Sequence, residues 1–177
     1  LNTEQELQQA IREDQFLIYY QPRVQTQTGK LLGIEALIRW QHPTRGLVLP
    51  NDFIGLAEET DLIHPIGELV VDKVCAQLAS WLKQGVEAVP VSVNVSPHQF
   101  NEGKVKKSLA ASLAKHGIPA SLLEIELTES AMMRNIGDIF DELTAINEMG
   151  IKVHVDDFGT GYSSLSLLQR LDMDILK

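Results

Sequence analysis

Residues 151–165 read IKVHVDDFGTGYSSL, an apolar strand that ends in two adjacent aspartates and then a loop with two glycines. Neighbouring carboxylates repel each other, so a fold tolerates them best where water or cations offset their charge. One interpretation is a solvated turn, because aspartate and glycine are common turn residues. The other is a metal site at a strand end, with the glycine-rich segment as a mobile lid. This stretch alone leaves both interpretations open.

The composition is that of a globular chain with an acidic balance. The 177 residues are 44% hydrophobic and have a formal net charge of −9, which suits one domain or part of a larger one. The lack of a basic block argues against binding nucleic acid as a polymer. The single cysteine, Cys75, excludes a disulfide scaffold and favours a reducing compartment. We therefore predict a cytoplasmic segment without membrane contact, whose parent protein can still be membrane-anchored elsewhere.

Strand and helix patterns alternate along the chain after an initial hairpin. Short turns separate them, which predicts a parallel sheet with right-handed crossovers. Pro22 is expected to interrupt the first strand near its end. The predicted strands are 16–24, 31–40, 89–96, 122–130, 151–156 and 173–177, and the predicted helices are 4–14, 50–60, 66–85, 104–116, 136–149 and 163–171.

Four polar residues interrupt the apolar strand patterns. They are Glu35, Asn94, Glu126 and Asp156, each within or at the C-terminal end of a different predicted strand. An open doubly wound sheet and a (β/α)8 barrel both fit the alternation of elements. An open sheet would spread four strand ends over roughly 15 Å, whereas a barrel brings them to one mouth, where barrel enzymes build their sites. Convergence favours the barrel.

The chemistry of these four residues favours a metal site. One of them alone is better explained as a core polar group that bonds to the backbone. Four together, mostly carboxylates, would cost many kcal/mol to bury without compensation, and divalent cations offset that cost. Oxygen-only ligands suit Mg²⁺ or Mn²⁺ rather than Zn²⁺. The lone His154 is expected to be a packed side chain rather than a ligand.

Seven short motifs occur in one order across the whole chain, and they resemble the EAL-domain cyclic di-GMP phosphodiesterases. The resemblance implies a TIM-like barrel whose first strand runs antiparallel. It also implies hydrolysis of cyclic di-GMP to linear pGpG in bacterial second-messenger signalling. The motifs are YYQP (19–22), EALIRW (35–40), LPNDFI (49–54), VNVS (93–96), ELTES (126–130), DDFGTGYSSL (156–165) and DILK (174–177).

The resemblance implies a ligand set for two ions. Glu35, Asn94, Glu126 and Asp156 would hold one Mg²⁺ or Mn²⁺, and Asp156 with Asp157 would hold a second. The shared ligand explains why two acidic residues stand side by side. Two ions about 3.5–4 Å apart can clamp a phosphodiester and give hydroxide near neutral pH. Glu35 and the aspartate pair are therefore expected to be catalytic.

Further roles follow from the same resemblance. Lys177 would be catalytic, because it would orient and polarise the attacking water. Gln21, Arg39 and Pro50 would contact the substrate, with the arginine pairing to a phosphate through its bidentate fork. Glu129 would anchor the glycine-rich loop. Taken alone, Lys177 would be a solvated terminal residue, and Gln21 and Arg39 would be ordinary surface polar groups.

The chain begins at Leu1 without a methionine and stops at Lys177, where the family continues through further strands. We expect residues 1–177 to be a partial EAL domain, truncated after the sixth strand begins and without the C-terminal strands. The part that continues in the family carries another catalytic glutamate and a glutamine near the ligand. Open sheet edges are expected to cause self-association as a homodimer or larger assembly. Little or no activity is expected of this chain as it stands.

A second function class remains open. The alternative is a catalytically inactive module that binds cyclic di-GMP or mediates dimers. Degenerate family members of that kind usually lose the glutamate of the EAL motif, the aspartate pair or the loop. All three are retained here, which favours the enzyme.

Overall fold

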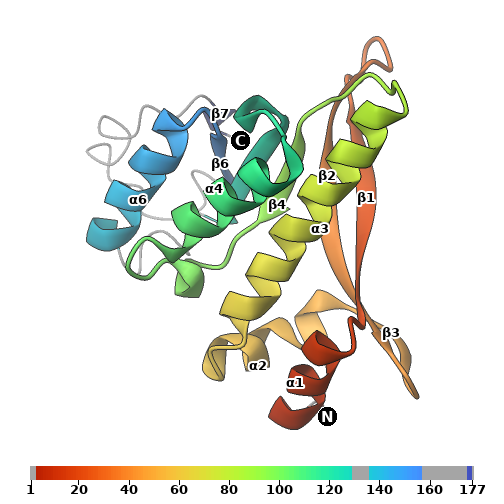
Figure 1. The fold of residues 1–177 in the computed structure, drawn as a ribbon, viewed down its shortest axis with the longest axis vertical. Coiled ribbons are helices and arrows are strands. Elements are labelled where there is room, and N and C mark those ends of the chain that lie inside the picture. The colour runs from red at the N-terminus through yellow and green to blue at the C-terminus, as the bar shows by residue number, and fades with distance from the viewer. Residues whose placement is uncertain (1–2, 129–135, 157–174, 177) are drawn as a thin grey trace.

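The computed structural model describes residues 3–128, 136–156 and 175–176, which form one mixed sheet with helices packed along it (Figure 1). The strand order is β1-β2-β4-β5-β6-β7, and β3 pairs with β2. The strands are β1 (Phe16–Val24), β2 (Leu31–His42), β3 (Gly46–Val48), β4 (Val91–Asn94), β5 (Leu123–Thr128), β6 (Lys152–Asp156) and β7 (Ile175–Leu176). The helices are α1 (Glu4–Arg12), α2 (Ile54–Glu59), α3 (Ile63–Lys83), α4 (Lys104–His116) and α6 (Ile136–Glu148), with 3-10 turns η1 (Pro50–Asp52), η2 (Pro97–Gln99) and η3 (Ala120–Leu122).

The sheet has the mixed topology that the sequence predicts. β1 runs antiparallel to β2, and each later neighbour along the path from β2 to β7 is parallel. The prediction that Pro22 interrupts β1 is wrong, because the strand continues to Val24 with Pro22 opposite Ile34. Within the described part of the chain, β1 is the first strand of the path, and an edge strand tolerates the missing N–H of proline.

Two stretches near β2 differ from the predicted elements. The short β3 folds back on the end of β2, with Gly46 in the left-handed region at φ +73°, and the sequence analysis did not predict it. The helix predicted at 50–60 is divided into η1 and α2, because the backbone of Phe53 leaves the helical region at φ −136° and ψ −20°. The Phe53 side chain is fully buried, so packing of this ring decides the local backbone.

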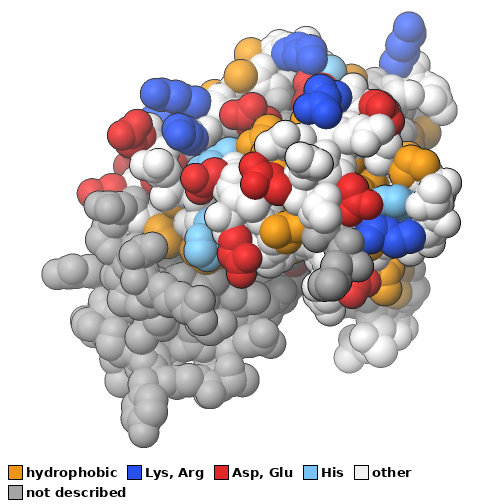
Figure 2. Space-filling view, turned by 90° about the horizontal axis from the view of Figure 1, so that it is seen from below, with side chains coloured by type: hydrophobic (Ala, Val, Ile, Leu, Met, Phe, Trp, Pro, Cys, Tyr) orange, Lys and Arg blue, Asp and Glu red, His pale blue; other side chains and the backbone are white. Residues whose placement is uncertain are grey.

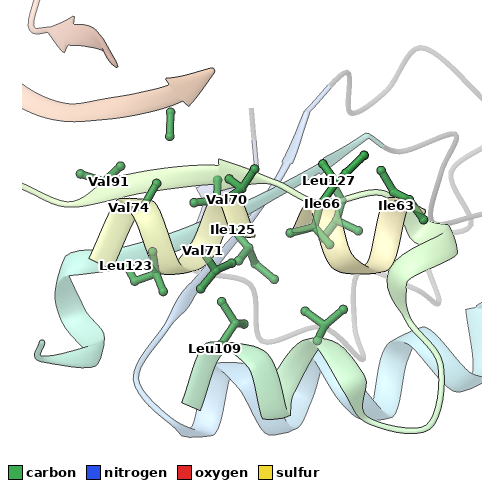
Figure 3. Close-up of a cluster of buried hydrophobic side chains, with 14 of the residues drawn as sticks. Ile63, Ile66, Val70, Val71, Val74, Val91, Leu109, Leu123, Ile125 and Leu127 are labelled. Atoms are coloured by element: carbon green, nitrogen blue, oxygen red, sulfur yellow. The ribbon is translucent and has the colours of Figure 1, made fainter. Parts of the chain in front are cut away.

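The hydrophobic core lies between the sheet and the helices. One row of α3 side chains faces the buried side of β4 and β5, and Leu109 of α4 lies across from them (Figure 3). The row follows helical spacing, and the strand residues follow the two-residue period of a pleated strand. Because the apolar side chains of β4 and β5 use this face, the polar residues that alternate with them are directed to the other one. The labelled cluster is Ile63, Ile66, Val70, Val71, Val74, Val91, Leu109, Leu123, Ile125 and Leu127.

α3 contains the single cysteine and is the longest helix described. Cys75 is fully buried, and burial together with the nearby charge of Asp72 raises the pKa of its thiol to about 11. A buried thiol with a raised pKa packs as a small apolar side chain. No helix in the described ranges is both long and apolar enough to cross a bilayer.

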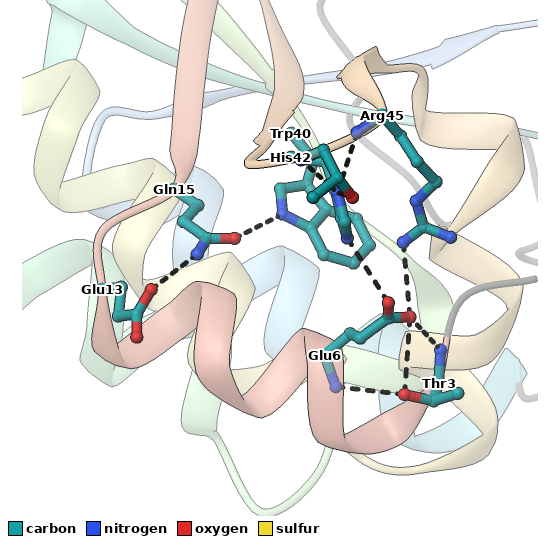
Figure 4. Close-up of polar contacts among 8 residues, drawn as sticks. Thr3, Glu6, Glu13, Gln15, Trp40, His42 and Arg45 are labelled. Atoms are coloured by element: carbon teal, nitrogen blue, oxygen red, sulfur yellow. Dashed lines mark hydrogen bonds and ion pairs between the residues drawn. The ribbon is translucent and has the colours of Figure 1, made fainter.

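α1 is fixed to the end of β2 by polar contacts around a buried tryptophan (Figure 4). The Nε1 of Trp40 donates to Oε1 of Gln15 at 2.9 Å. Glu6 of α1 pairs with Nε2 of His42 at 3.4 Å and with the guanidinium of Arg45 at 3.3 Å. These contacts hold the C-terminal part of β2, the strand that also contains Glu35.

Candidate functional site

The two faces of the sheet have different chemistry. Side chains alternate between faces along a strand, and register partners in neighbouring strands share a face. Ala36 pairs with Val93, which pairs with Ile125 and then Val153, and all four are buried against the helices. The residues between them form the opposite face, which we call the polar face. Its described members are Gln21, Arg23, Glu35, Arg39, Ser92, Asn94, Glu124, Glu126, Lys152 and His154.

On the polar face, Glu35 and Asn94 are in direct contact. The Nδ2 of Asn94 donates to Oε1 of Glu35 at 3.0 Å. Asn94 is the last residue of β4, and its register partner in β5 is Glu126. Three of the four predicted first-ion ligands therefore stand on adjacent strands β2, β4 and β5, on one face.

Glu126 is 2% exposed and lies within a charged cluster. The Nη1 of Arg23 lies 2.9 Å from Oε1 of Glu126, and its Nη2 lies 3.4 Å from Oε2 of Glu124. The Nε2 of His154 lies 2.7 Å from the same Oε2 of Glu124. Burial raises the pKa of the Glu124 carboxyl, but the hydrogen bond from His154 and the charges of His154, Arg23 and Lys152 outweigh burial and lower that pKa overall.

The predicted substrate contacts Gln21 and Arg39 lie at different positions along the first hairpin. Gln21 is the register partner of Glu35 across the β1–β2 ladder. The guanidinium of Arg39 lies 5.5 Å from the centre of the Tyr19 ring and donates to the carbonyl of Ile38 at 2.8 Å. An arginine has five N–H donors, so this backbone contact uses only part of its capacity to bind a ligand.

A cavity of about 490 Å³ lies between the sheet and helices α2, α3 and α4, and its lining is mostly apolar, with core side chains such as Ile66 and Leu109. Pro50, Asn94 and Glu126 all line it, together with Leu37 and Ser96. The cavity therefore brings a predicted substrate contact together with two predicted metal ligands. Its volume lies in the usual range for small-molecule sites. Viewed from the lower end of Figure 1, the surface has acidic side chains across its middle and most of its lysine and arginine side chains toward the rim (Figure 2).

Four of the predicted site residues lie wholly or partly outside the described residues. The backbone of Asp156 pairs with Thr128 at the end of β6, and nothing further is described of its side chain. Asp157, Glu129 and Lys177 are outside the described ranges. Their predicted roles therefore stay predictions.

The side-chain oxygen atoms of the described site residues are of the type that a hard divalent cation prefers. Glu35, Asn94 and Glu126 supply oxygen ligands, which Mg²⁺ and Mn²⁺ prefer. No group of three or more histidine, cysteine, aspartate or glutamate side chains that would hold a metal gathers in the described ranges. An asparagine is not among those residue types, so a mixed site with Asn94 is compatible with that result. A buried carboxylate such as Glu126 also requires positive charge nearby.

The sequence analysis did not identify Arg23 and Glu124 as part of the site region. The signal was present, because Glu124 and Glu126 alternate with buried Leu123 and Ile125 in a strand pattern. His154 is 2% exposed, and its burial confirms the prediction of a packed side chain. Its bond to a buried carboxylate could not be anticipated from the strand pattern.

Comparisons with known proteins agree on one family. The family model described as EAL domain matches residues 4–177. The bifunctional diguanylate cyclase/cyclic di-GMP phosphodiesterase MucR of Pseudomonas aeruginosa is 41% identical over 172 residues, which are 97% of this chain and 25% of that protein. The cyclic di-GMP phosphodiesterase NbdA of the same organism is 40% identical over 177 residues, which are 100% of this chain and 23% of that protein. The chain thus spans about a quarter of the length of these relatives.

Solved structures show the same fold. The PaMucR phosphodiesterase in complex with c-di-GMP has a TM-score of 0.90 and 41% identity, and the match covers 97% of this chain and 70% of that chain. The FimX EAL domain of Xanthomonas citri in complex with c-di-GMP has a TM-score of 0.85 and 28% identity, with coverage of 97% and 66%. The mixed sheet and its antiparallel first strand therefore match TIM-barrel-like EAL domains, as the sequence predicts.

Proposed function

The chain belongs to the EAL domain family, and from this premise we propose that it is part of a phosphodiesterase that hydrolyses cyclic di-GMP to linear pGpG. The relatives named as cyclic di-GMP phosphodiesterases support the substrate and the reaction class. The observation that carries the proposal is the contact between Glu35 and Asn94 on the polar face, with Glu126 as the register partner of Asn94 in β5. These side chains offer oxygen atoms on one face of the sheet, which supports a phosphodiester site there.

We propose that the enzyme uses two Mg²⁺ or Mn²⁺ ions. Glu35, Asn94 and Glu126 would hold the first ion with Asp156, and Asp156 with Asp157 would hold the second. When bound, the ions supply positive charge for the phosphodiester and lower the pKa of the attacking water. The chain's own residues orient these ligands, because β2, β4 and β5 fix them at neighbouring positions of one rigid sheet.

Substrate binding is proposed for residues around the same face. Arg39 would pair with a phosphate oxygen through two parallel N–H groups. Its contact with Tyr19 restricts the guanidinium to the polar face. Gln21, opposite Glu35 in the β1–β2 ladder, would hydrogen-bond to the ligand, and Pro50 would contact it from the cavity wall.

Two roles are proposed from the family pattern for residues outside the described ranges. Lys177 would hold the attacking water within hydrogen-bond reach and favour its deprotonated form. Glu129 would anchor the glycine-rich loop that follows Asp157. Glu129 belongs to the same motif as Glu126, which lies on the polar face.

The test is a product assay with cyclic di-GMP. Incubation of cyclic di-GMP with the full-length parent protein and Mn²⁺ or Mg²⁺, followed by chromatography, is expected to yield linear pGpG, whereas residues 1–177 alone are expected to yield little or none. Removal of the metal with a chelator is expected to stop product formation, and restored Mn²⁺ should recover it. Binding of cyclic di-GMP without any product would support the inactive binding module instead.

A further inference from the structure

Arg23 joins the first hairpin to the buried carboxylates of β5. Its guanidinium lies within 2.9 Å of Glu126 and within 3.4 Å of Glu124, which are more than a hundred residues away in sequence. Each carboxylate is contacted by a different terminal nitrogen, so the planar fork spans the two side chains. Glu124 and Glu126 are 6% and 2% exposed. Two buried carboxylates on one face of one strand require such a cation.

Gly33 provides the space through which this guanidinium passes. It is the register partner of Arg23 in the β1–β2 ladder. A Cβ atom at position 33 would lie 3.2 Å from Nη2 of Arg23 and 3.2 Å from the carbonyl oxygen of Pro90. Both contacts are tighter than ordinary van der Waals contact, so an added Cβ would crowd the guanidinium and also the backbone at Pro90. The missing side chain at position 33 and the fork of Arg23 are therefore complementary.

Glu124 fixes the guanidinium from its other end. His154 of β6 lies 2.7 Å from the same carboxylate oxygen that Arg23 approaches. The contacts form a chain from His154 through Glu124 and Arg23 to Glu126. This series of contacts restricts the rotation of the Glu126 side chain, which lines the cavity.

We propose that Arg23 is a positioning residue that orients the Glu126 carboxylate on the polar face for binding a divalent cation. The inference rests on the proposed function, in which Glu126 is a metal ligand. Hydrogen bonds to metal-ligating carboxylates commonly set metal affinity by about 10–100-fold. The arginine fork orients the Glu126 carboxylate through directed N–H groups. A lysine ammonium group at the same place would supply the charge but only part of this orientation.

The experiment measures Mn²⁺ affinity by calorimetry for the full-length protein and matched variants. Arg23→Met keeps most of the side-chain volume and removes the fork. It is expected to weaken Mn²⁺ binding about tenfold or more. The thermal unfolding midpoint of each metal-free protein is measured as well, so that a loss of stability is distinguished from a loss of metal affinity. Arg23→Lys is expected to fall between that variant and wild type. Arg12→Met, on the exposed side of α1, is the control for loss of one positive charge and is expected to bind as wild type does.

A second variant keeps the inference testable if Arg23→Met does not fold. Gly33→Ala retains the arginine and crowds its guanidinium at 3.2 Å, so it is expected to weaken Mn²⁺ binding in the same direction but less than Arg23→Met does. Unchanged affinity in the folded variants would overturn the inference, and tighter binding would show that Arg23 competes with the ion. If wild type forms pGpG while the Arg23 variants bind Mn²⁺ normally, only the inference fails. If wild type neither binds Mn²⁺ nor forms pGpG, the proposed function fails with it.

Discussion

The side-chain amide of Asn94 lies 3.0 Å from the carboxylate of Glu35, although 59 positions separate them in the sequence. The contact arises because β2 and β4 are parallel neighbours, with Glu35 opposite Ser92 and Asn94 two residues further along. Both side chains stand on the polar face, opposite the apolar core. Residues that share one site in this way are expected to act as a unit.

The first prediction concerns that pair. Glu35→Gln and Asn94→Ala are each expected to remove most of the phosphodiesterase activity, because the first removes the negative charge of one proposed ligand and the second removes the oxygen of another ligand of the same ion. The double variant is expected to lose little more than either single one, since coupled residues are not additive. The measurement is a double-mutant cycle, which compares the steady-state rates of wild type, the two single variants and the double variant. Fully additive losses would show that the two residues act separately.

The second prediction concerns Arg39. Arg39→Lys keeps the positive charge and removes the planar fork, so it is expected to raise KM for cyclic di-GMP about tenfold with a smaller change in kcat. Arg12→Lys is the matched control on α1. Equal KM values for wild type and Arg39→Lys would argue against a bidentate phosphate contact.

The sequence predicts the framework of this site better than its internal contacts. Glu126 could be recognised because it interrupts the apolar alternation of Ile125 and Leu127, and the same period places it on the face of Asn94. The Arg23–Glu124 pair could not be predicted, because it depends on how the antiparallel hairpin curves over strands 101 residues away. Pro22 was expected to interrupt β1, but the strand lies at the edge of the described sheet, where a missing N–H costs little.

The third prediction tests the packing that supports β2. The ring of Phe53 lies 5.6 Å from that of Phe16 and 5.8 Å from that of Trp40, and all three are fully buried. Phe53→Ala is expected to reduce the free energy of unfolding by about 3–5 kcal/mol, measured by urea denaturation. Leu49→Ala, at a side chain that is 50% exposed, is the control and should stay within about 0.5 kcal/mol. Equal losses in both variants would contradict this account of the core.

The fourth prediction is a pH dependence between α3 and α4. Hydrogen bonds from Lys115 and His116 lower the pKa of Asp72 below its ordinary value of 3.8. A depressed carboxyl pKa stabilises the fold above pH 3.8, and this contribution is lost as the pH falls through the lower folded value. Urea unfolding is measured at about pH 5 and about pH 3. The decrease in the free energy of unfolding between these pH values should be smaller for Asp72→Asn than for wild type.

The expected difference is a few tenths to about 1 kcal/mol, because the Asp72 side chain is 40% exposed and solvent screens the pair. Asp61→Asn removes an exposed carboxyl in the turn between α2 and α3 and serves as the control. If the free energy of unfolding of Asp72→Asn decreases between these pH values as much as that of wild type does, the ion pair does not stabilise the fold.

The most direct test of the central claim is the formation of pGpG from cyclic di-GMP at saturating Mn²⁺ by the full-length parent protein, as wild type and as Glu35→Gln. Glu35→Gln retains the size of the side chain and a hydrogen-bonding group beside Asn94, so it isolates the charge of the proposed ligand. Wild type is expected to form pGpG, and Glu35→Gln is expected to fall to the rate that wild type shows in chelator. An Mn²⁺-dependent rate in Glu35→Gln equal to that of wild type would contradict the metal site on the polar face.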